Sequence, residues 1–508
     1  MHEFKKYIPL IISSCIIAGM LLGMHLRDVY WHKQTAFQAI GFDRIDEVMN
    51  FVNNKYVDDV EKEKLMNETI NGLLQKLDPH SSYIPVENTQ EGYEKMQGKF
   101  DGIGIEFQII NDTAIVVGML KNSPAKYAGM EIGDKIFNIN SKKVTGKNIN
   151  SDSLRLLLKG SKGTKVNVKI LRNTDTIHYT IYRNTIQVAS IPYVFKLNDT
   201  TLFVKIDEFT QQTYREFYDS LIQLKNDTTK HLIIDLRNNP GGYLSEAINI
   251  LDEIFEAKKL LLYTDGSHKQ RKEYISKRKG IFENYKISVL VNENSASASE
   301  IIAGAIQDWD RGTIIGQETF GKGLVQEEYE LSNGSILRLT IARYYTPSGR
   351  CIQRDYSEGT DKYYENAEKR LLHKDSSNIN KSINTNNYYT LLKHRTVKGK
   401  GGISPDIIIK NNLQQNSFDL NWYNKINEII YSNYHTLPRQ EKDINTLRKY
   451  IIQKLQTKYK ADKTILLRHE NLINDFVYKI CLGETSWYKQ KMLTDEFIKS
   501  ALKNDLNL

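Results

Sequence analysis

The sequence predicts an α/β protein, mixed α+β overall, whose largely parallel sheet follows a smaller β-rich segment and is flanked by helical regions. From Ile191 to about Ile341, short apolar runs alternate with amphipathic helices, the pattern of a parallel sheet with crossover helices. From Gly98 to Asn184, short β-runs are punctuated by glycines. Apolar residues recur at helical spacing in 36–77 and 421–502. At 508 residues, the chain is long enough for several domains.

The first thirty residues predict a membrane anchor. Tyr7–Leu26 is a run of twenty residues without Asp, Glu, Lys or Arg, which is the length that a helix needs to cross a bilayer. Lys5 and Lys6 precede the run, and the positive-inside rule then keeps the N-terminus in the cytoplasm. We therefore expect residues 1–30 to anchor the chain, with the rest on the extracytoplasmic (periplasmic) side. A cleaved signal peptide is the alternative.

The three cysteines indicate neither a metal site nor a disulfide framework. Cys15 lies inside the apolar run, where Ser13-Ser14-Cys15 weakly resembles a lipoprotein processing site, so lipidation stays an alternative. A bridge between Cys351 and Cys481 is a further alternative in an oxidising compartment.

The formal net charge of +9 comes from Lys and Arg residues spread along the chain. No recognisable nucleic-acid-binding motif accompanies them, so we interpret the charge as a solvated surface and expect no nucleic-acid partner.

Changes in composition and in hydrophobic periodicity along the chain predict the domain boundaries. Asp78-Pro79-His80 ends the N-terminal helical pattern, and residues 356–394 are polar with little periodicity, typical of a surface insertion. We expect a separate helical region at the C-terminus. The predicted parts are an anchor or signal at 1–30, helices at 36–94, the β-rich domain at 95–186, the α/β core at 187–355 and 395–412, the insertion at 356–394, and C-terminal helices at 413–508.

Ser297 stands between a predicted buried strand and a predicted helix. With Glu300 three residues later it matches a capping box, which needs no catalysis. The alternative is a nucleophile, because free N–H groups at a helix start can stabilise an oxyanion. A serine hydroxyl needs a base to act in this way.

The residues alone leave two kinds of general base possible, a histidine or a lysine. The histidines closest to Ser297 in sequence are His231 and His268, and a histidine that is distant in sequence can still lie beside the serine in space. Lys322 lies between two glycines and after an aromatic residue; it can act as a base if burial keeps it neutral. Its other interpretation is an ordinary exposed lysine in a turn.

Two segments, NENSASASEIIAGAIQDW and GQETFGKGLVQ, together resemble the signature of the carboxyl-terminal processing (tail-specific) peptidases. The resemblance implies that Ser297 is the nucleophile, that Lys322, 25 residues later, is the general base, and that Gln326 positions the lysine. It covers roughly 42–409 and implies a crotonase/ClpP-like peptidase core with an inserted PDZ domain, acting without a metal or cofactor.

Two further segments carry the same resemblance. DLRNNPGG resembles the family's oxyanion-hole loop, which makes the backbone of Gly241 or Gly242 a candidate beside that of Ala298. GIGI, together with NSPAKYAGMEIGDKIFNIN, resembles a PDZ domain. The implied peptide-binding loop is Gly102, Ile103, Gly104 and Ile105, whose amides can form an anion-binding nest.

The resemblance implies a serine endopeptidase that cleaves proteins near their C-termini and acts in envelope protein processing or degradation. The PDZ domain would bind unstructured, apolar C-terminal tails and gate access to the dyad. An adaptor protein and a homodimer are further expectations. The rivals are a catalytically silent PDZ scaffold at the membrane and a histidine-based hydrolase.

Overall fold

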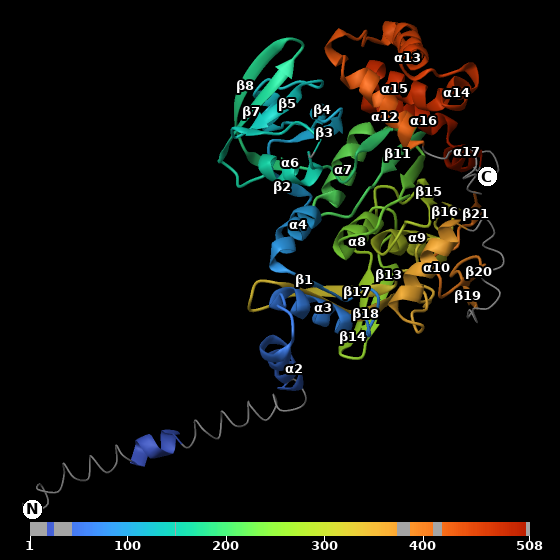
Figure 1. The fold of residues 1–508 in the computed structure, drawn as a ribbon. Helices are drawn as coiled ribbons and strands as arrows, with labels where there is room; N and C mark the ends of the chain where they lie inside the picture. The colour runs from blue at the N-terminus through green and yellow to red at the C-terminus, as the bar shows by residue number, and fades with distance from the viewer. Residues whose placement is uncertain (1–17, 25–42, 148, 373–386, 410–418, 504–508) are drawn as a thin grey trace, which may run out of the picture. The chain divides into compact units, whose positions relative to one another are not determined.

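The computed structural model of the protein describes residues 18–24, 43–147, 149–372, 387–409 and 419–503 (Figure 1). By its internal contacts the chain divides into two units, Met1–Leu73 and Leu74–Leu508.

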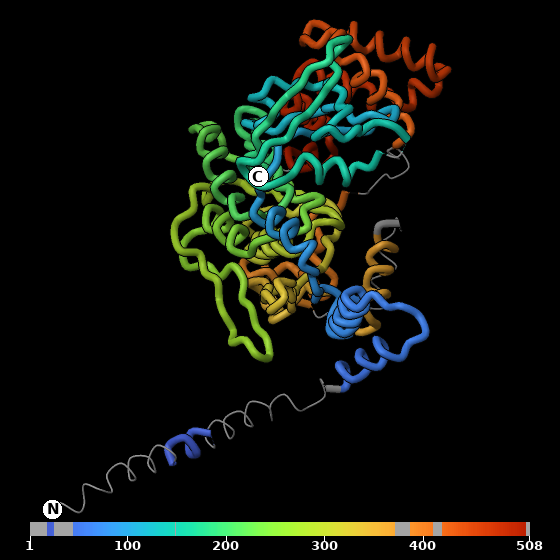
Figure 2. Tube along the Cα trace, turned by 60° about the vertical axis from the view of Figure 1, so that its left-hand side comes forward, coloured from blue at the N-terminus to red at the C-terminus, as the bar shows by residue number. Residues whose placement is uncertain are grey.

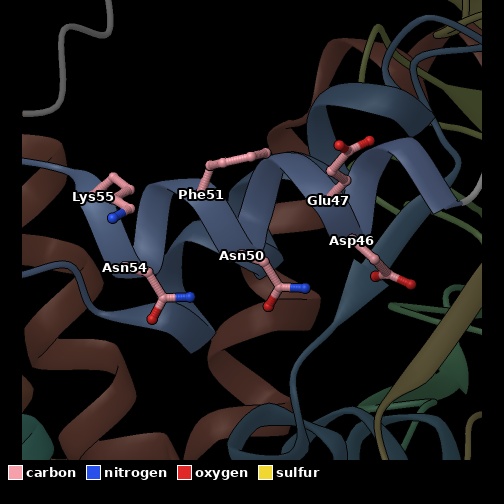
Figure 3. Close-up of a pocket in the computed structure, with 6 residues that line it drawn as sticks. All are labelled: Asp46, Glu47, Asn50, Phe51, Asn54 and Lys55. Carbon is pink, nitrogen blue, oxygen red and sulfur yellow. The ribbon is translucent and has the colours of Figure 1, made fainter.

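The first unit contains helices α2 (Asp43–Lys55) and α3 (Lys62–Leu74), as the helical periodicity predicts. A cavity of about 460 Å³ runs along α2, and all six residues that line it come from this one helix (Figure 3). Most of the predicted anchor, Tyr7–Leu26, lies outside the described residues. Among the residues that are described, no helix combines the length and apolarity needed to cross a membrane.

The β-rich segment of the second unit is a sheet with strand order β3-β4-β5-β7-β8, and β6 pairs with β5. The antiparallel ribbon of β2 and β9 joins its two ends, so the chain enters and leaves this domain at one place. The elements are β2 (Lys99–Gly102), β3 (Ile105–Ile110), β4 (Thr113–Met119), α5 (Pro124–Tyr127), β5 (Lys135–Ile139), β6 (Lys142–Lys143), α6 (Ser151–Leu158), β7 (Lys165–Arg172), β8 (Asp175–Tyr182) and β9 (Asn184–Gln187).

The core is a six-stranded sheet with the order β10-β11-β12-β15-β16-β21. Every neighbouring pair from β11 to β21 is parallel, which confirms the predicted largely parallel sheet; only β10 is antiparallel. Parallel strands end at one edge, so the loops after β11, β12, β15 and β16 gather there. The strands are β10 (Tyr193–Lys196), β11 (Thr201–Lys205), β12 (His231–Asp235), β15 (Lys286–Val291), β16 (Thr313–Gly316) and β21 (Ile407–Ile408).

Helices cover both faces of this sheet, because alternate side chains of a strand point to opposite sides. One face packs with buried residues of α7 (Thr213–Leu224), α8 (Leu244–Asp252) and α9 (Ala298–Asp308). On the other face, Phe203, Ile233 and Leu290 pack against Met492 and Ile498 of the C-terminal helices. This double burial explains the unbroken apolar runs of β12 and β15.

A second sheet has the order β1-β18-β13-β14, with β17 also paired to β18. It includes β1, which follows the Asp78-Pro79-His80 segment and precedes helix α4 (Val86–Gln97). The strands are β1 (Ser82–Ile84), β13 (Leu260–Gly266), β14 (Lys269–Ile275), β17 (Leu324–Glu330) and β18 (Ile336–Tyr345). Cys351 and Cys481 are both free thiols.

The described parts of the polar insertion, up to residue 372 and from residue 387, contain regular secondary structure. Thr360–Leu372 forms helix α10, Asn387–Tyr389 forms β19, and β19 pairs with β20 (Thr396–Lys398). Tyr363 is 3% exposed. The less exposed positions of the first three turns are Thr360, Tyr363, Ala367 and Arg370, spaced three, four and three residues apart. A stripe this narrow in a charged segment is hard to detect in a sequence.

The C-terminal helices are not the separate region that the sequence suggests. Ile426 and Ile430 of α12 share one apolar cluster with Ile110 and Ile115 of the β-rich domain, and Figure 2 shows these segments, in red and cyan, side by side. Helical periodicity reveals an apolar face but not the surface that covers it. The helices are α12 (Leu420–Tyr431), α13 (Ile444–Tyr459), α14 (Lys463–Arg468), α15 (Glu470–Leu482), α16 (Glu484–Thr494) and α17 (Glu496–Lys503), with 3-10 turns at Tyr434–Thr436 and Glu441–Asp443.

Candidate active site

Ser297 is the N-cap of α9 and follows the carboxyl end of β15. Its backbone angles, φ 54° and ψ −112°, lie in a region that non-glycine residues rarely adopt. The N–H groups of Glu300 and Ile301 donate to the Ser297 carbonyl (2.9 and 3.0 Å), so the helix start is secured by backbone bonds. Such strained positions persist where the surroundings fix them, and they cluster at functional sites.

Glu300 makes several of the contacts that hold Ser297 in this conformation. Its carboxylate is fully buried and accepts four hydrogen bonds. Oε1 takes the Thr319 hydroxyl (2.6 Å) and the Gly321 N–H (2.7 Å), while Oε2 takes the N–H groups of Ser297 and Lys322 (2.9 Å each). Burial raises the pKa of Glu300 to about 7, although the donated hydrogen bonds oppose this shift. The Ser297–Glu300 motif therefore also binds the loop that carries Lys322.

Lys322 lies in the loop between β16 and β17, and its Nζ donates to Oε1 of Gln326 (2.9 Å). Burial lowers its pKa to about 8, with the positive charge of Arg338 adding to the shift and Glu300 opposing it. Near neutral pH, a larger share of this amine is therefore unprotonated than of an ordinary lysine.

Gln326 connects the lysine to a segment far away in sequence. Its Nε2 donates to the backbone carbonyl of His80, in the Asp78-Pro79-His80 segment. Burial lowers the pKa of the His80 imidazole to about 3, helped by the charge of Lys322. In the sequence, His80 marks only a boundary between regions, and nothing in the local pattern shows that it lies beside Gln326.

The loop after β12 places Gly241 against Ser297, since a Cβ on Gly241 would lie 2.7 Å from Cβ of Ser297. Of the two candidate glycines, Gly241 has its N–H committed to Oδ1 of Asn239 (2.8 Å). Among the described residues, the N–H groups of Gly242 and Ala298 have no hydrogen-bond acceptor. Asn239 was not singled out in the sequence; its carbonyl accepts from Ala296 N (3.0 Å) and Ser299 Oγ (3.0 Å).

Arg237, in the same loop, connects it to the C-terminal helices. Its guanidinium contacts Asp235 (2.7 Å) and Asp495 (2.8 Å) and stacks on the ring of Phe497 (4.6 Å). A polar cavity of about 250 Å³ lies at this junction. The α16–α17 helices thus hold the end of β12, where the Gly241 loop begins.

The two histidines proposed as alternative bases lie elsewhere. His231 is at the amino end of β12, and its Nε2 is 2.9 Å from Oγ of Ser288. Because β12 and β15 are parallel, this is the end of the sheet opposite to Ser297. His268 is exposed in the turn between β13 and β14.

The predicted PDZ loop lies where β2 leads into β3. Gly104 has φ 74°, and its carbonyl accepts from Leu120 N (3.0 Å). Within the described part of the chain, the N–H groups of Ile103 and Gly104 lack acceptors. In the described sheet β3 pairs on one side only, so its other edge is open. Gly102 ends β2 and Ile105 begins β3, which places the four predicted residues together.

Family models match three parts of the chain: Peptidase family S41 at residues 200–361, a PDZ domain at 102–182, and the Activating protease CtpB N-terminal domain at 24–88. A carboxy-terminal-processing protease of Bartonella bacilliformis is 34% identical over 67% of this chain and 79% of its own. A probable CtpA-like serine protease of Staphylococcus epidermidis is 34% identical over 64% of this chain and 67% of its own.

Among solved structures, the photosystem II D1 C-terminal processing protease shows 22% identity over 75% of this chain and 90% of that one, with a TM-score of 0.37. The similarity to these sequence relatives shows that the chain belongs to the carboxy-terminal-processing proteases of peptidase family S41. It is a serine-type peptidase with a PDZ domain.

Proposed function

We propose that the chain hydrolyses peptide bonds through an acyl-enzyme, with Ser297 as the nucleophile and Lys322 as the general base. The observation that carries the proposal is that one oxygen, Oε2 of Glu300, accepts the N–H groups of both residues (2.9 Å each). A shared acceptor keeps the two loops in fixed register. The pKa of about 8 at Lys322 suits a base that works near neutral pH.

In the proposed reaction, Nζ of neutral Lys322 takes the hydroxyl proton of Ser297 while Oγ attacks the substrate carbonyl. The N–H groups of Ala298 and Gly242 donate to the oxyanion, since the Gly241 N–H is committed to Asn239. The tetrahedral intermediate loses the amine, which receives its proton from Lys322. Water then attacks the ester with Lys322 again as base, releasing the new C-terminus.

Gln326 is proposed to orient Lys322. The Oε1–Nζ hydrogen bond (2.9 Å) limits the rotamers of a side chain that is otherwise flexible. The amide cannot take the lysine proton, so it orients the amine without competing as a base.

The PDZ domain is proposed to bind unstructured, apolar C-terminal tails and so to control which proteins reach Ser297. The free N–H groups of Ile103 and Gly104 suit a terminal carboxylate, and the open edge of β3 suits strand addition by the tail. We further propose an envelope location with Tyr7–Leu26 as the anchor. Carbonate extraction tests that part: a spanning anchor keeps the protein in the membrane pellet, and release would contradict it.

The test of the chemistry compares purified wild type with Ser297→Ala and Lys322→Ala on a protein that ends in an unstructured apolar tail. Both variants should lose about 10³-fold or more in kcat/KM. Ser245→Ala and Lys277→Ala are the matched controls, because both residues are exposed and outside the site. Activity retained by either site variant, with normal folding by circular dichroism, would overturn the proposal. Tail binding without cleavage by wild type would favour the silent scaffold.

A further inference from the structure

Helix α10 of the insertion packs directly against the loop that carries Lys322. The ring of Tyr363 meets that of Phe320 edge-on at 6.1 Å, and the guanidinium of Arg354 stacks over both rings at 4.2 and 4.4 Å. In the last turn of the helix, Arg370 pairs with Glu318 (2.8 Å). Both ends of the helix therefore contact the Glu318–Lys322 loop.

A chain of contacts leads from this helix to the amine of Lys322. The Tyr363 hydroxyl is 3.1 Å from Nε2 of His80. The carbonyl of His80 accepts from Nε2 of Gln326, and Oε1 of Gln326 accepts from Nζ of Lys322 (2.9 Å). Each link joins a different segment of the chain, so the position of Gln326 depends on where the Asp78-Pro79-His80 segment is held.

The His80 side chain holds its contact with Tyr363 and does not act as a second base. Its imidazole is neutral at neutral pH, because burial and the charges of Lys322 and Arg354 lower its pKa to about 3, although the charge of Asp78 opposes the shift. A neutral ring bonds the Tyr363 hydroxyl whichever nitrogen carries the proton. The N–H of Ser81, which shares a planar peptide unit with the His80 carbonyl, donates to Asp78 Oδ1 (2.9 Å), and this bond fixes the plane of the carbonyl that accepts from Gln326.

We propose that Tyr363 is a positioning residue for Lys322, acting through His80 and Gln326, so that the insertion completes the active site. This inference rests on the proposed role of Lys322 as the base. A purely structural Tyr363 would support only the stability of α10. A positioning Tyr363 sets both the direction of the Lys322 amine and the exclusion of water around it.

A structural role and a positioning role of Tyr363 predict different effects of pH on the activity that is lost when its hydroxyl is removed. Around Lys322, Glu300 and Asp78 favour the charged amine, whereas burial and Arg338 favour the neutral form. If the His80 segment loosens, water enters and the burial contribution falls, so the pKa of the lysine rises toward its ordinary value of 10.5. The loss of activity is then large at neutral pH and small at alkaline pH.

The test is Tyr363→Phe in the full chain, which removes one hydroxyl and keeps the ring that meets Phe320 edge-on. We expect kcat/KM to fall about tenfold at pH 7 and less than about threefold at pH 10, mostly through kcat, because one pKa unit changes the neutral fraction tenfold. Tyr356→Phe is the matched control, since its hydroxyl contacts only Arg343 (3.1 Å) among the hydrogen bonds of the described residues. It should leave the profile unchanged.

His80→Ala, which keeps the backbone carbonyl, tests the path. It should change the pH profile in the same pH range as Tyr363→Phe. The double variant should be no worse than the stronger single variant, because both substitutions remove the contact between Tyr363 and His80. An equal loss at every pH, an additive double variant, or an unchanged profile would overturn the inference. If Lys322→Ala also retains activity, the proposed function fails as well; if Lys322→Ala is inactive, only the role of Tyr363 fails.

Discussion

Glu300 holds the backbone of Lys322: its Oε2 accepts the Lys322 N–H at 2.9 Å, through the same oxygen that accepts the N–H of Ser297. The second oxygen holds Thr319 and Gly321 of the same loop. One buried carboxylate thus sets the relation between two loops that follow neighbouring strands, β15 and β16.

Replacing Glu300 with Gln should therefore damage both stability and cleavage. The amide has one acceptor oxygen for four donors, so at least one backbone N–H loses its partner, at about 1–3 kcal/mol of unfolding free energy. We expect kcat/KM to fall about tenfold or more beyond any unfolded fraction. Urea denaturation and peptide cleavage measure the two effects. Glu293→Gln, in the loop before Ser297, is the control; a variant that behaves like this control would contradict the role of Glu300.

Lys322→Met should change how stability depends on pH. Burial lowers the pKa of Lys322 from 10.5 to about 8, so between these values the unfolded chain binds more protons than the folded one. The lysine's burial therefore costs stability below pH 8, and the cost is relieved as pH rises toward 10.5. Relative to wild type, the variant should lose up to about 3 kcal/mol of unfolding free energy between pH 7 and 10.5.

The measurement is denaturant unfolding of both proteins across that range. Exposed Lys277 is the matched control, and Lys277→Met should give a constant difference from wild type. A constant difference for Lys322→Met too would mean that Lys322 is not held with a lowered pKa.

Gly104→Ala should weaken tail binding to the PDZ domain. Gly104 has φ 74°, and an added Cβ would lie 2.5 Å from Cβ of Ser123, so the loop must shift its free N–H groups. We expect a fluorescent apolar C-terminal peptide to bind about tenfold more weakly, by anisotropy.

The matched control for this loop is Gly92→Ala in α4, where an added Cβ meets nothing within 4 Å. Cleavage of the tailed protein should fall with binding, while a short peptide substrate tests whether the PDZ domain also gates the site. Unchanged peptide affinity would contradict the assignment of the carboxylate loop.

The strands of the parallel core could be predicted because β12 and β15 are buried on both faces and read as unbroken apolar runs. Ser297, Lys322 and Gln326 could be named because their spacing matches a known family. The contacts that organise them leave no local pattern. Gln326 reaches the His80 carbonyl across 246 positions of sequence, and Tyr363 reaches the His80 ring across 283.

Two features of the structure leave little trace in the sequence. Helix α10 lies in a segment that shows little periodicity, because charged residues occupy much of its surface and its buried stripe around Tyr363 is narrow. The C-terminal helices were expected to stand apart, although Met492 and Ile498 complete the second face of the core sheet. In both cases the periodicity of the sequence shows only the apolar face of a helix, whereas the surface that covers this face comes from a distant part of the sequence.

The most direct test of the central claim is active-site labelling with a fluorophosphonate, followed by mass spectrometry of the modified peptide and by its rate against pH. We expect one adduct on Ser297, formed at a rate that rises through about pH 8 as Lys322 loses its proton. Lys322→Ala should label far more slowly and without that inflection. An adduct on another residue, or an unchanged rate and pH profile in Lys322→Ala, would contradict the Ser297–Lys322 dyad.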